Sequence, residues 1–462
     1  MTAAPTAAGA AGAQRLRAGP WLWLLVWLVA FGLSQLVPPM QSPDENSHIA
    51  RADTLTRGQW LLGLQAGSLG TGSTVDEGLL TFIDIHMRQA AHPGRRLDPA
   101  ERAQADAARW TGRERYAAIP GTGYYLPFVY APQALGLGLG RALDLDIATS
   151  YQLARAATLL ACVALLAAAV RVLPPNPFVV AVLLLPMSLF QLLSPTLDGV
   201  TACLALLLLA LFLAGWDRGR PFGAAASATL AAGLLLLAGS RIHLLPLLAL
   251  PLWLAWRRRS RRDLVLGLLA AAASLAWVMI ALRRTVDLRI PRQHSTAELV
   301  THYVTQPLEF FRVVGATLAH DETRDFYLTS FVGNLGWLDT PLAPGLYPWL
   351  WTGLGLAALL SLRWRPGSGD LGARLWLLAS ALACAALTFF ALLVAWTPHP
   401  AVLVGGIQGR YFIVPALVAG HALSGLAAAA AWRPRGLAGP AVAAFALLSG
   451  HALVTTLLAR YH

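Results

Sequence analysis

The strongest constraint on this chain is a succession of apolar runs, several of which reach the roughly 20 residues that a helix needs to cross the hydrocarbon core of a bilayer. Only 13% of the residues are charged and 56% are hydrophobic, whereas soluble proteins average roughly 25% charged residues. The sequence therefore predicts an all-α polytopic membrane protein with about 11–12 transmembrane helices. It excludes a soluble enzyme, a nucleic-acid-binding protein and a secreted disulfide scaffold. The runs lie near residues 20–37, 122–140, 151–170, 177–193, 199–215, 222–239, 243–256, 264–282, 346–363, 375–396, 411–431 and 437–458.

Arginines between the runs indicate which side of the membrane each loop faces. Lysine is absent, so all 35 basic residues are arginines, and the formal net charge is +12. Positive residues in short loops favour the cytoplasmic side, and residues 257–262 hold five arginines in one such loop. Working outward from it, we expect residues 1–19 to form a cytoplasmic tail and residues 20–462 an integral membrane domain. The other arginines assigned to the cytoplasm are Arg15, Arg17, Arg171, Arg218, Arg220, Arg363, Arg365, Arg374, Arg433 and Arg435.

The same assignment places three loops outside: residues 38–121, 284–345 and 397–410. Loops longer than about 12–15 residues are usually functional or disordered, and neither long loop is low in complexity. We expect both to form short helices that lie on the membrane surface, for example over residues 100–109 and 307–314. The functional site is therefore expected on the outer face.

The run 122–140 is the weakest candidate to cross the membrane, because Pro127 and Pro132 interrupt it and it is rich in glycine. We interpret it as an interfacial or re-entrant segment, which leaves about eleven crossings with the C-terminus outside. The alternative is a plain transmembrane helix, which would move Asp198 to the inside.

The segment after the first run carries the first candidate residues. Ser42 and Glu45 match a capping box, which would make Glu45 a structural residue. Asp44 is not needed for that box, and an acid at the membrane boundary suits a general base. Asp44 and His48 are also spaced four apart on one helix face, as a metal pair would be, although a packed or solvated histidine is the commoner case.

Further along the chain, an acid and two arginines are predicted at the outer ends of membrane helices. Asp198 is flanked by apolar residues, where ionisable groups are costly and usually functional; a helix cap is the alternative. Arg410 is a planar donor suited to a phosphate, and Tyr411 follows it. Ordinary snorkelling beside an aromatic belt would also explain this pair. Arg241 forms a second, weaker basic site on the same face.

Trp337 and Asp339 form the last candidate site. A tryptophan ring beside a carboxylate suits stacking on a sugar and hydrogen bonding to it. A tight Gly/Pro turn with an interfacial tryptophan explains the segment almost as well. No P-loop, GxGxxG, HExxH or GxSxG motif occurs in a convincing setting, so an enzyme on the outer face would need a substrate that is already in the membrane.

The order of four motifs resembles a known family. They are Pro43-Asp44-Glu45-x-x-His48, then Leu185-Pro186-Met187 with Gln191 and Ser194-Pro195-x-x-Asp198, then Leu335-Gly336-Trp337-Leu338-Asp339, and finally Gly409-Arg410-Tyr411-Phe412. Together they resemble a family of bacterial polytopic membrane proteins, long labelled as a domain of unknown function, that is grouped with the GT-C glycosyltransferases. The resemblance extends over nearly the whole chain.

This resemblance implies transfer of a sugar from a polyprenyl-phosphate or polyprenyl-diphosphate donor on the outer face of the membrane. Asp44 matches the acid of the first outer loop, which acts as general base or binds a metal, and Glu45 is its neighbour in an acidic pair. Asp198 matches a second acid of several GT-C groups. Arg410 matches a late arginine near the lipid phosphate.

The resulting hypothesis is an inverting glycosyltransferase of the bacterial inner membrane, acting on an envelope or lipid-linked glycan. Asp44, Glu45 and Asp198 would be catalytic, and Asp44 and Asp198 would hold a divalent cation, Mg²⁺ or Mn²⁺, if one is used. Arg410 and Arg241 would hold the donor phosphate. The rival hypotheses are a lipid-linked glycan transporter and a non-catalytic membrane subunit. The residues expected to contact the substrate are His48, Trp337, Asp339 and Tyr411.

Overall fold

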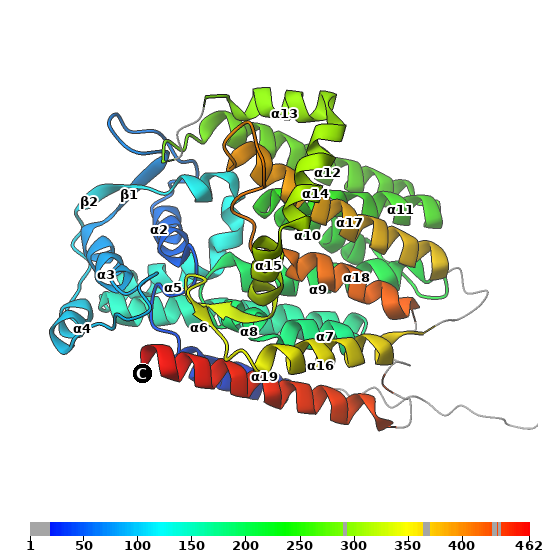
Figure 1. Cartoon of the computed structure of the whole chain (residues 1–462), viewed down its shortest axis with the longest axis horizontal. Coiled ribbons are helices and arrows are strands. Elements are labelled where there is room, and N and C mark those ends of the chain that lie inside the picture. The colour runs from blue at the N-terminus through cyan, green and yellow to red at the C-terminus, as the bar shows by residue number, and fades with distance from the viewer. Residues whose placement is uncertain (1–18, 290–292, 364–369, 427–431, 433–435) are drawn as a thin grey trace, which may run out of the picture.

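The fold was analysed in a computed structural model that describes residues 19–289, 293–363, 370–426, 432 and 436–462. Helices lie side by side along one direction, and most of the long segment between α1 and α5 gathers at one end of them, hereafter the loop end (Figure 1). The predicted tail up to residue 18, and Arg365, Arg433 and Arg435, lie outside the described residues.

Among the described residues, eight uninterrupted apolar helices form most of the bundle. Five are long and apolar enough to cross a membrane, and three are shorter. The long ones are α6 (Ile147–Val172), α9 (Leu197–Trp216), α12 (Arg261–Arg284), α17 (Asp370–Ala395) and α19 (Ala438–Tyr461); the shorter ones are α1 (Pro20–Ser34), α10 (Ala224–Ser240) and α16 (Leu346–Ser361).

Three further apolar segments are interrupted. Proline lacks the N–H that continues a helix, and Pro186 separates α7 (Pro177–Leu184) from α8 (Pro186–Leu193). Two other segments begin with a 3-10 turn: η3 (Ile242–Leu248) runs into α11 (Ala249–Arg258), and η4 (Gly409–Phe412) runs into α18 (Ile413–Ser424). Five long, three short and three interrupted segments make eleven within the described part of the chain, which is the number that the sequence predicts.

The segment 122–140 does not cross the bundle. It forms η1 (Pro120–Tyr124), η2 (Pro127–Tyr130) and α5 (Ala131–Ala142). The 12 residues of α5 cover about 18 Å, less than the roughly 30 Å of a bilayer core. By itself α5 is thus too short to cross the core, which suits the interfacial interpretation; that interpretation remains a prediction. The glycines of α5 let it pack tightly on α6, because a Cβ on Gly136 would lie 2.3 Å from the backbone of Ala154.

The first long loop is folded, and its apolar core is shared with α5, α6 and α9. Its helices are α2 (Glu45–Thr56), α3 (Glu77–Met87) and α4 (Pro99–Asp106). The all-helical prediction is wrong in one respect, since β1 (Gly72–Asp76) and β2 (Glu114–Ala118) pair antiparallel, with Gly72 opposite Ala118. The sequence analysis missed them because each strand has only five residues. The C-terminus reaches the same end, where Arg96 donates to the His462 carbonyl at 3.0 Å.

The second long loop is helical, as predicted. It forms α13 (Thr296–Thr305), α14 (Pro307–Ala319) and α15 (Asp321–Gly333), followed by the short pair β3 (Asn334–Leu335) and β4 (Thr340–Pro341). On α14, Leu308, Phe311 and Leu318 are exposed, which suits a helix lying on a membrane surface. That placement remains a prediction.

Candidate functional site

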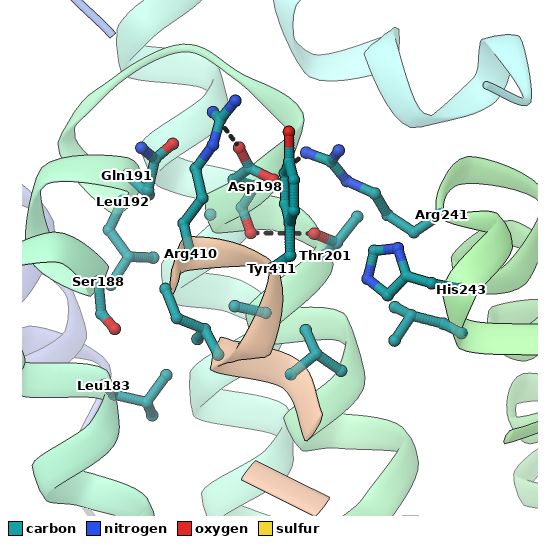
Figure 2. A pocket seen from close by; sticks show the side chains of 15 residues that line it. Leu183, Ser188, Gln191, Leu192, Asp198, Thr201, Arg241, His243, Arg410 and Tyr411 are labelled. Carbon is teal, nitrogen blue, oxygen red and sulfur yellow. Dashed lines mark hydrogen bonds and ion pairs between the residues drawn. The ribbon is translucent and has the colours of Figure 1, made fainter. Parts of the chain in front are cut away.

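Four of the predicted residues meet at the loop end of the bundle. Asp44, Asp198, Arg241 and Arg410 form one connected set of ion pairs, hereafter the site cluster. They come from four separate segments: the turn before α2, the first turn of α9, the residue after α10, and η4. Figure 2 shows Asp198 between the two guanidinium groups.

Arg410 is the centre of the cluster, and its side chain is almost fully buried. It donates to Asp44 Oδ2 at 2.8 Å and to Asp198 Oδ2 at 3.1 Å. Its Nε donates to Gln408 Oε1 at 2.6 Å, and Nη1 also reaches the Pro43 carbonyl at 3.4 Å. A guanidinium can hold two carboxylates at once because its donors form a planar fork.

Asp198 binds both arginines. It is the second residue of α9, and its Oδ1 accepts a hydrogen bond from Arg241 Nη2 while its Oδ2 faces Arg410. Arg241 follows α10 directly, and its guanidinium lies 5.2 Å from the centre of the Tyr125 ring. Both oxygens of Asp198 are therefore occupied by guanidinium donors.

Asp44 is the accessible acid of the cluster. Its side chain is 57% exposed, whereas that of Arg410 is 2% exposed. It precedes α2 with a left-handed φ of 64°. Partial burial acts to raise the pKa of the Asp44 carboxyl, but Arg410 and then His48 outweigh it, so that the pKa lies below its usual value. Asp44 is thus an ionised carboxylate held beside a cation.

The histidine and tyrosine nearest to Asp44 are neutral. His48 lies one turn further along α2 and shares a hydrogen bond of 2.9 Å between its Nδ1 and the Tyr130 hydroxyl. Burial lowers the pKa of His48 to about 4, and burial raises the pKa of Tyr125 to about 12. Both groups are therefore uncharged near pH 7.

The site cluster fits a divalent cation poorly. Both oxygens of Asp198 and one oxygen of Asp44 already accept bonds from guanidinium groups. Within the described ranges, no group of three or more histidine, cysteine or acidic side chains is arranged to hold a metal ion. We therefore derive no step through a metal.

A small cavity of about 30 Å³ lies against Arg410 and Asp198. It has room for about one water molecule. Its polar lining includes Ser188, Gln191 and Thr201, and Tyr411 and His243 close one side, as Figure 2 shows. Tyr411 thus lies beside the cluster, and its contact with substrate remains a prediction.

Glu45 does not join the cluster. The structure corrects the predicted capping box, since α2 begins at Glu45 and its N-cap is Asp44 rather than Ser42. Glu45 Oε2 still accepts from the Ser42 N–H at 3.0 Å, but the carboxylate points to Tyr151 of α6. The hydrogen bonds of the Glu45 carboxylate therefore do not involve Arg410 or its partners.

Trp337 and Asp339 are also placed away from the cavity lining. Asp339 Oδ1 accepts from the Trp337 N–H and the Thr340 hydroxyl, both at 3.0 Å, which closes a tight turn. The Trp337 indole donates to the Met40 carbonyl at 2.9 Å. The alternative of a structural turn therefore explains these two residues better than a sugar site does.

Several residues at the site were not among the predicted ones. Gln191 lines the cavity, Gln408 binds Arg410, and Tyr125 and Tyr130 contact Arg241 and His48. Gln191 stands in a quoted motif, and both tyrosines stand in the segment 122–140, so a signal was present in the sequence. Only the fold shows that these segments meet.

Comparison with known proteins gives a family but no characterised close relative. No curated protein matches the chain. A crystal structure of ArnT from Cupriavidus metallidurans bound to undecaprenyl phosphate is distantly similar, with 18% sequence identity and a TM-score of 0.37; the match covers 95% of this chain and 76% of that one. The family described as "Predicted membrane protein (DUF2142)" matches residues 25–419. The chain therefore belongs to this family of membrane proteins, as the order of its motifs led us to expect.

Proposed function

We propose that this protein is an inverting membrane glycosyltransferase that takes a sugar from a polyprenyl-phosphate donor at the outer face of the bacterial inner membrane. The observation that carries the proposal is the placement of Arg410, which is buried and joins an accessible acid to a buried one. A phosphate-binding cation and a general base then stand side by side.

The donor phosphate is expected to bind Arg410 in place of Asp44. Guanidinium groups form strong, charge-assisted hydrogen bonds with phosphate oxygens. Arg410 already offers two of its nitrogens to carboxylate oxygens, and Asp44 is the more exposed of the two acids. Binding of the phosphate would therefore release the Asp44 carboxylate, while Asp198 keeps both guanidinium groups in place.

Transfer is proposed as a single displacement at the anomeric carbon. An acceptor hydroxyl attacks that carbon and forms the new C–O bond, while the bond from the anomeric carbon to the phosphate oxygen breaks. The proton of the hydroxyl moves to the Asp44 carboxylate. The electron pair of the broken bond stays on the phosphate, where Arg410 and Arg241 stabilise the added negative charge.

The charge of the cluster suits this step. Two arginines and two aspartates sum to zero, and His48 is neutral near pH 7. During transfer one negative charge leaves Asp44 and one appears on the departing phosphate. Because the two changes cancel, the net charge at the site is conserved.

The proposal is tested by transfer from a synthetic donor. Purified protein in proteoliposomes would be given radiolabelled polyprenyl-phosphate sugars and an acceptor fraction extracted from membranes of a deletion strain. We expect label to pass from the donor to the acceptor with the natural chain and not with Arg410→Gln. Arg115→Gln is the matched control, since Arg115 forms an exposed ion pair with Asp84.

Two results would contradict the proposal. One is the absence of transfer across a panel of donor sugars with correctly folded protein. The other is normal transfer by the Arg410→Gln variant. Movement of the intact labelled donor across the bilayer, without transfer, would favour the transporter hypothesis instead.

A further inference from the structure

A buried chain of hydrogen bonds fastens the turn that carries Asp44. The Tyr151 hydroxyl donates to Glu45 Oε1 and accepts from Arg155 Nη2 at 2.6 Å. Glu45, Tyr151 and Arg155 are 0%, 0% and 1% exposed. An arginine inside an apolar helix is costly unless it is paired or hydrogen-bonded, so this arrangement calls for a specific explanation.

Glu45 holds the backbone of the turn. Its Oε1 accepts from the Met40 N–H at 3.1 Å, and its Oε2 accepts from the Ser42 N–H at 3.0 Å. With the Tyr151 hydroxyl, three donors face one carboxylate. These bonds fix the peptide groups that immediately precede Asp44.

Arg155 holds the end of the first helix in the same network. Its Nη1 donates to the Ser34 carbonyl at 2.8 Å, and its Nη2 donates to the Val37 carbonyl at 2.9 Å. The last carbonyls of a helix lack partners within the helix. Arg155 donates to the last residue of α1 and to Val37 just beyond it, and thereby joins the end of α1 to Tyr151 and Glu45.

The turn needs this support because its backbone is strained. Met40 and Asp44 have φ values of 63° and 64°. A left-handed φ is unfavourable for a residue other than glycine. Such residues persist where the surrounding structure over-determines them, and they cluster at functional sites. Here the two left-handed residues enclose the peptide groups that Glu45 binds.

We infer that Tyr151 and Glu45 are positioning residues that hold the Met40–Asp44 turn in the geometry that places the Asp44 carboxylate against Arg410. The catalytic role of Asp44 in this geometry rests on the proposed function, but the positioning of its carboxylate by Tyr151 and Glu45 does not. Without the Tyr151 hydroxyl, Glu45 loses a donor and Arg155 loses an acceptor. The turn then relaxes toward right-handed φ values, and the side chain at position 44 moves away from Arg410.

A thiol at position 44 reports this geometry without any sugar transfer. The natural cysteines Cys162, Cys203 and Cys384 are all buried, so Asp44→Cys adds one accessible thiol. A free thiol has a pKa of about 8.5, and a neighbouring arginine lowers it. Arg410 stays in place through Asp198 and Gln408. Alkylation by a membrane-impermeant reagent, followed against pH, therefore measures how close position 44 lies to Arg410.

We expect the alkylation profile of Asp44→Cys to have its midpoint about one pH unit below that of a free thiol. Adding Tyr151→Phe, or separately Glu45→Gln, should return the midpoint most of the way to the free value. Adding Arg410→Gln should do the same. Tyr116→Phe is the matched control, because the Tyr116 hydroxyl also makes two backbone bonds, at 2.8 Å to Gly63 and Gly70, but in the first outer loop.

The inference is overturned if the Tyr151→Phe and Glu45→Gln variants titrate like Asp44→Cys alone, since both residues would then only fill space. It is also overturned if the thiol introduced by Asp44→Cys titrates as a free thiol when the network is intact. Because two variants break the network at different residues, poor folding of one still leaves the other to decide. Failure of sugar transfer would leave the alkylation result unchanged, so the two proposals can fail separately.

Discussion

The site cluster differs instructively from a second set of ion pairs, which joins the first long loop to α5. In that second set, hereafter the Asp53 cluster, Asp53 binds Arg57 at 2.8 Å and also binds Arg141, and it accepts the Asp76 N–H at 3.3 Å. Its side chain is 0% exposed, whereas that of Asp44 is 57% exposed. The same residue types thus enclose a carboxylate completely in one region and leave one accessible in the other.

The largest effect is expected at Asp44. Asp44→Asn removes the proposed base and should reduce transfer by about 10²–10⁴-fold, the usual contribution of a positioned general base. Stability should change little because the side chain is mostly exposed. Initial rates of label transfer, with melting curves of the same preparations, would check this. Asp84→Asn, on an exposed ion pair of α3, is the control, and a normal rate in Asp44→Asn would contradict the role of Asp44.

The reverse outcome is expected at Asp53. Asp53→Asn leaves Arg141 without its carboxylate partner and Arg57 with only the exposed Glu114. Because both arginines are partly exposed, we expect a loss of folding free energy below the roughly 3–5 kcal/mol of a fully buried pair. Denaturant unfolding of the detergent-solubilised protein would measure the loss. If Asp53→Asn proved as stable as the natural chain, the contrast between the two clusters would disappear.

A smaller effect is expected when residue 410 keeps a positive charge but loses the planar guanidinium group. Arg410→Lys removes the fork that reaches Asp44 and Asp198 together, so we expect donor affinity to fall by about 100-fold. The dependence of the transfer rate on donor concentration would show it. Arg96→Lys, at the carbonyls of α19, serves for comparison, and equal behaviour of the two variants would indicate that only charge matters at Arg410.

The smallest effect concerns pH. Burial lowers the pKa of His48 to about 4, and burial also lowers the pKa of His86, on α3, to about 4. The unfolded chain then binds protons below about pH 6.5 that the folded chain does not bind, so stability falls as the pH falls from 6.5 toward 4. At pH 5 each histidine should cost about 2 kcal/mol.

Unfolding free energies at pH 7 and pH 5 would test this, with His48→Gln and His86→Gln each recovering about half of the difference. One histidine lies beside the site cluster and the other under the first outer loop, so the two variants report on the two regions separately. A difference that persists in the double variant would exclude these histidines as its source.

Much of the architecture could be predicted because apolar length and arginine placement act locally. The number of apolar segments and the failure of residues 122–140 to cross follow from run length and from Pro127 and Pro132. The strands β1 and β2 could not be found in this way, since pairing Gly72 with Ala118 depends on the fold of the whole loop.

Which residues meet at the site could be predicted from the sequence, but the role of each residue could not. Asp44, Asp198, Arg241 and Arg410 were expected at one end of the bundle and do meet there. Glu45 was grouped with Asp44 because the two are adjacent in sequence, yet successive residues at the start of a helix point in different directions. Trp337 was considered a sugar-binding residue, but its indole supports the turn of Asp44 through Met40.

One signal in the sequence was overlooked. Arg155 stands inside an otherwise apolar run, where a charge is unexpected. With Tyr151 one helical turn away, it could have been recognised as a buried polar pair awaiting a partner. Its partner, Glu45, is 106 residues from Tyr151, and only the tertiary structure identifies it.

The separation between Arg155 and the helix end that it binds has a consequence for biosynthesis. Ser34 and Arg155 are 121 residues apart. At roughly 5–20 residues per second, the ribosome would add Arg155 roughly 6–24 s after Ser34. Throughout that interval the first membrane helix is already made, while the guanidinium that completes its end has not yet been synthesised. The segment that presents the reactive acid would therefore acquire its final shape only after the third apolar run has entered the membrane.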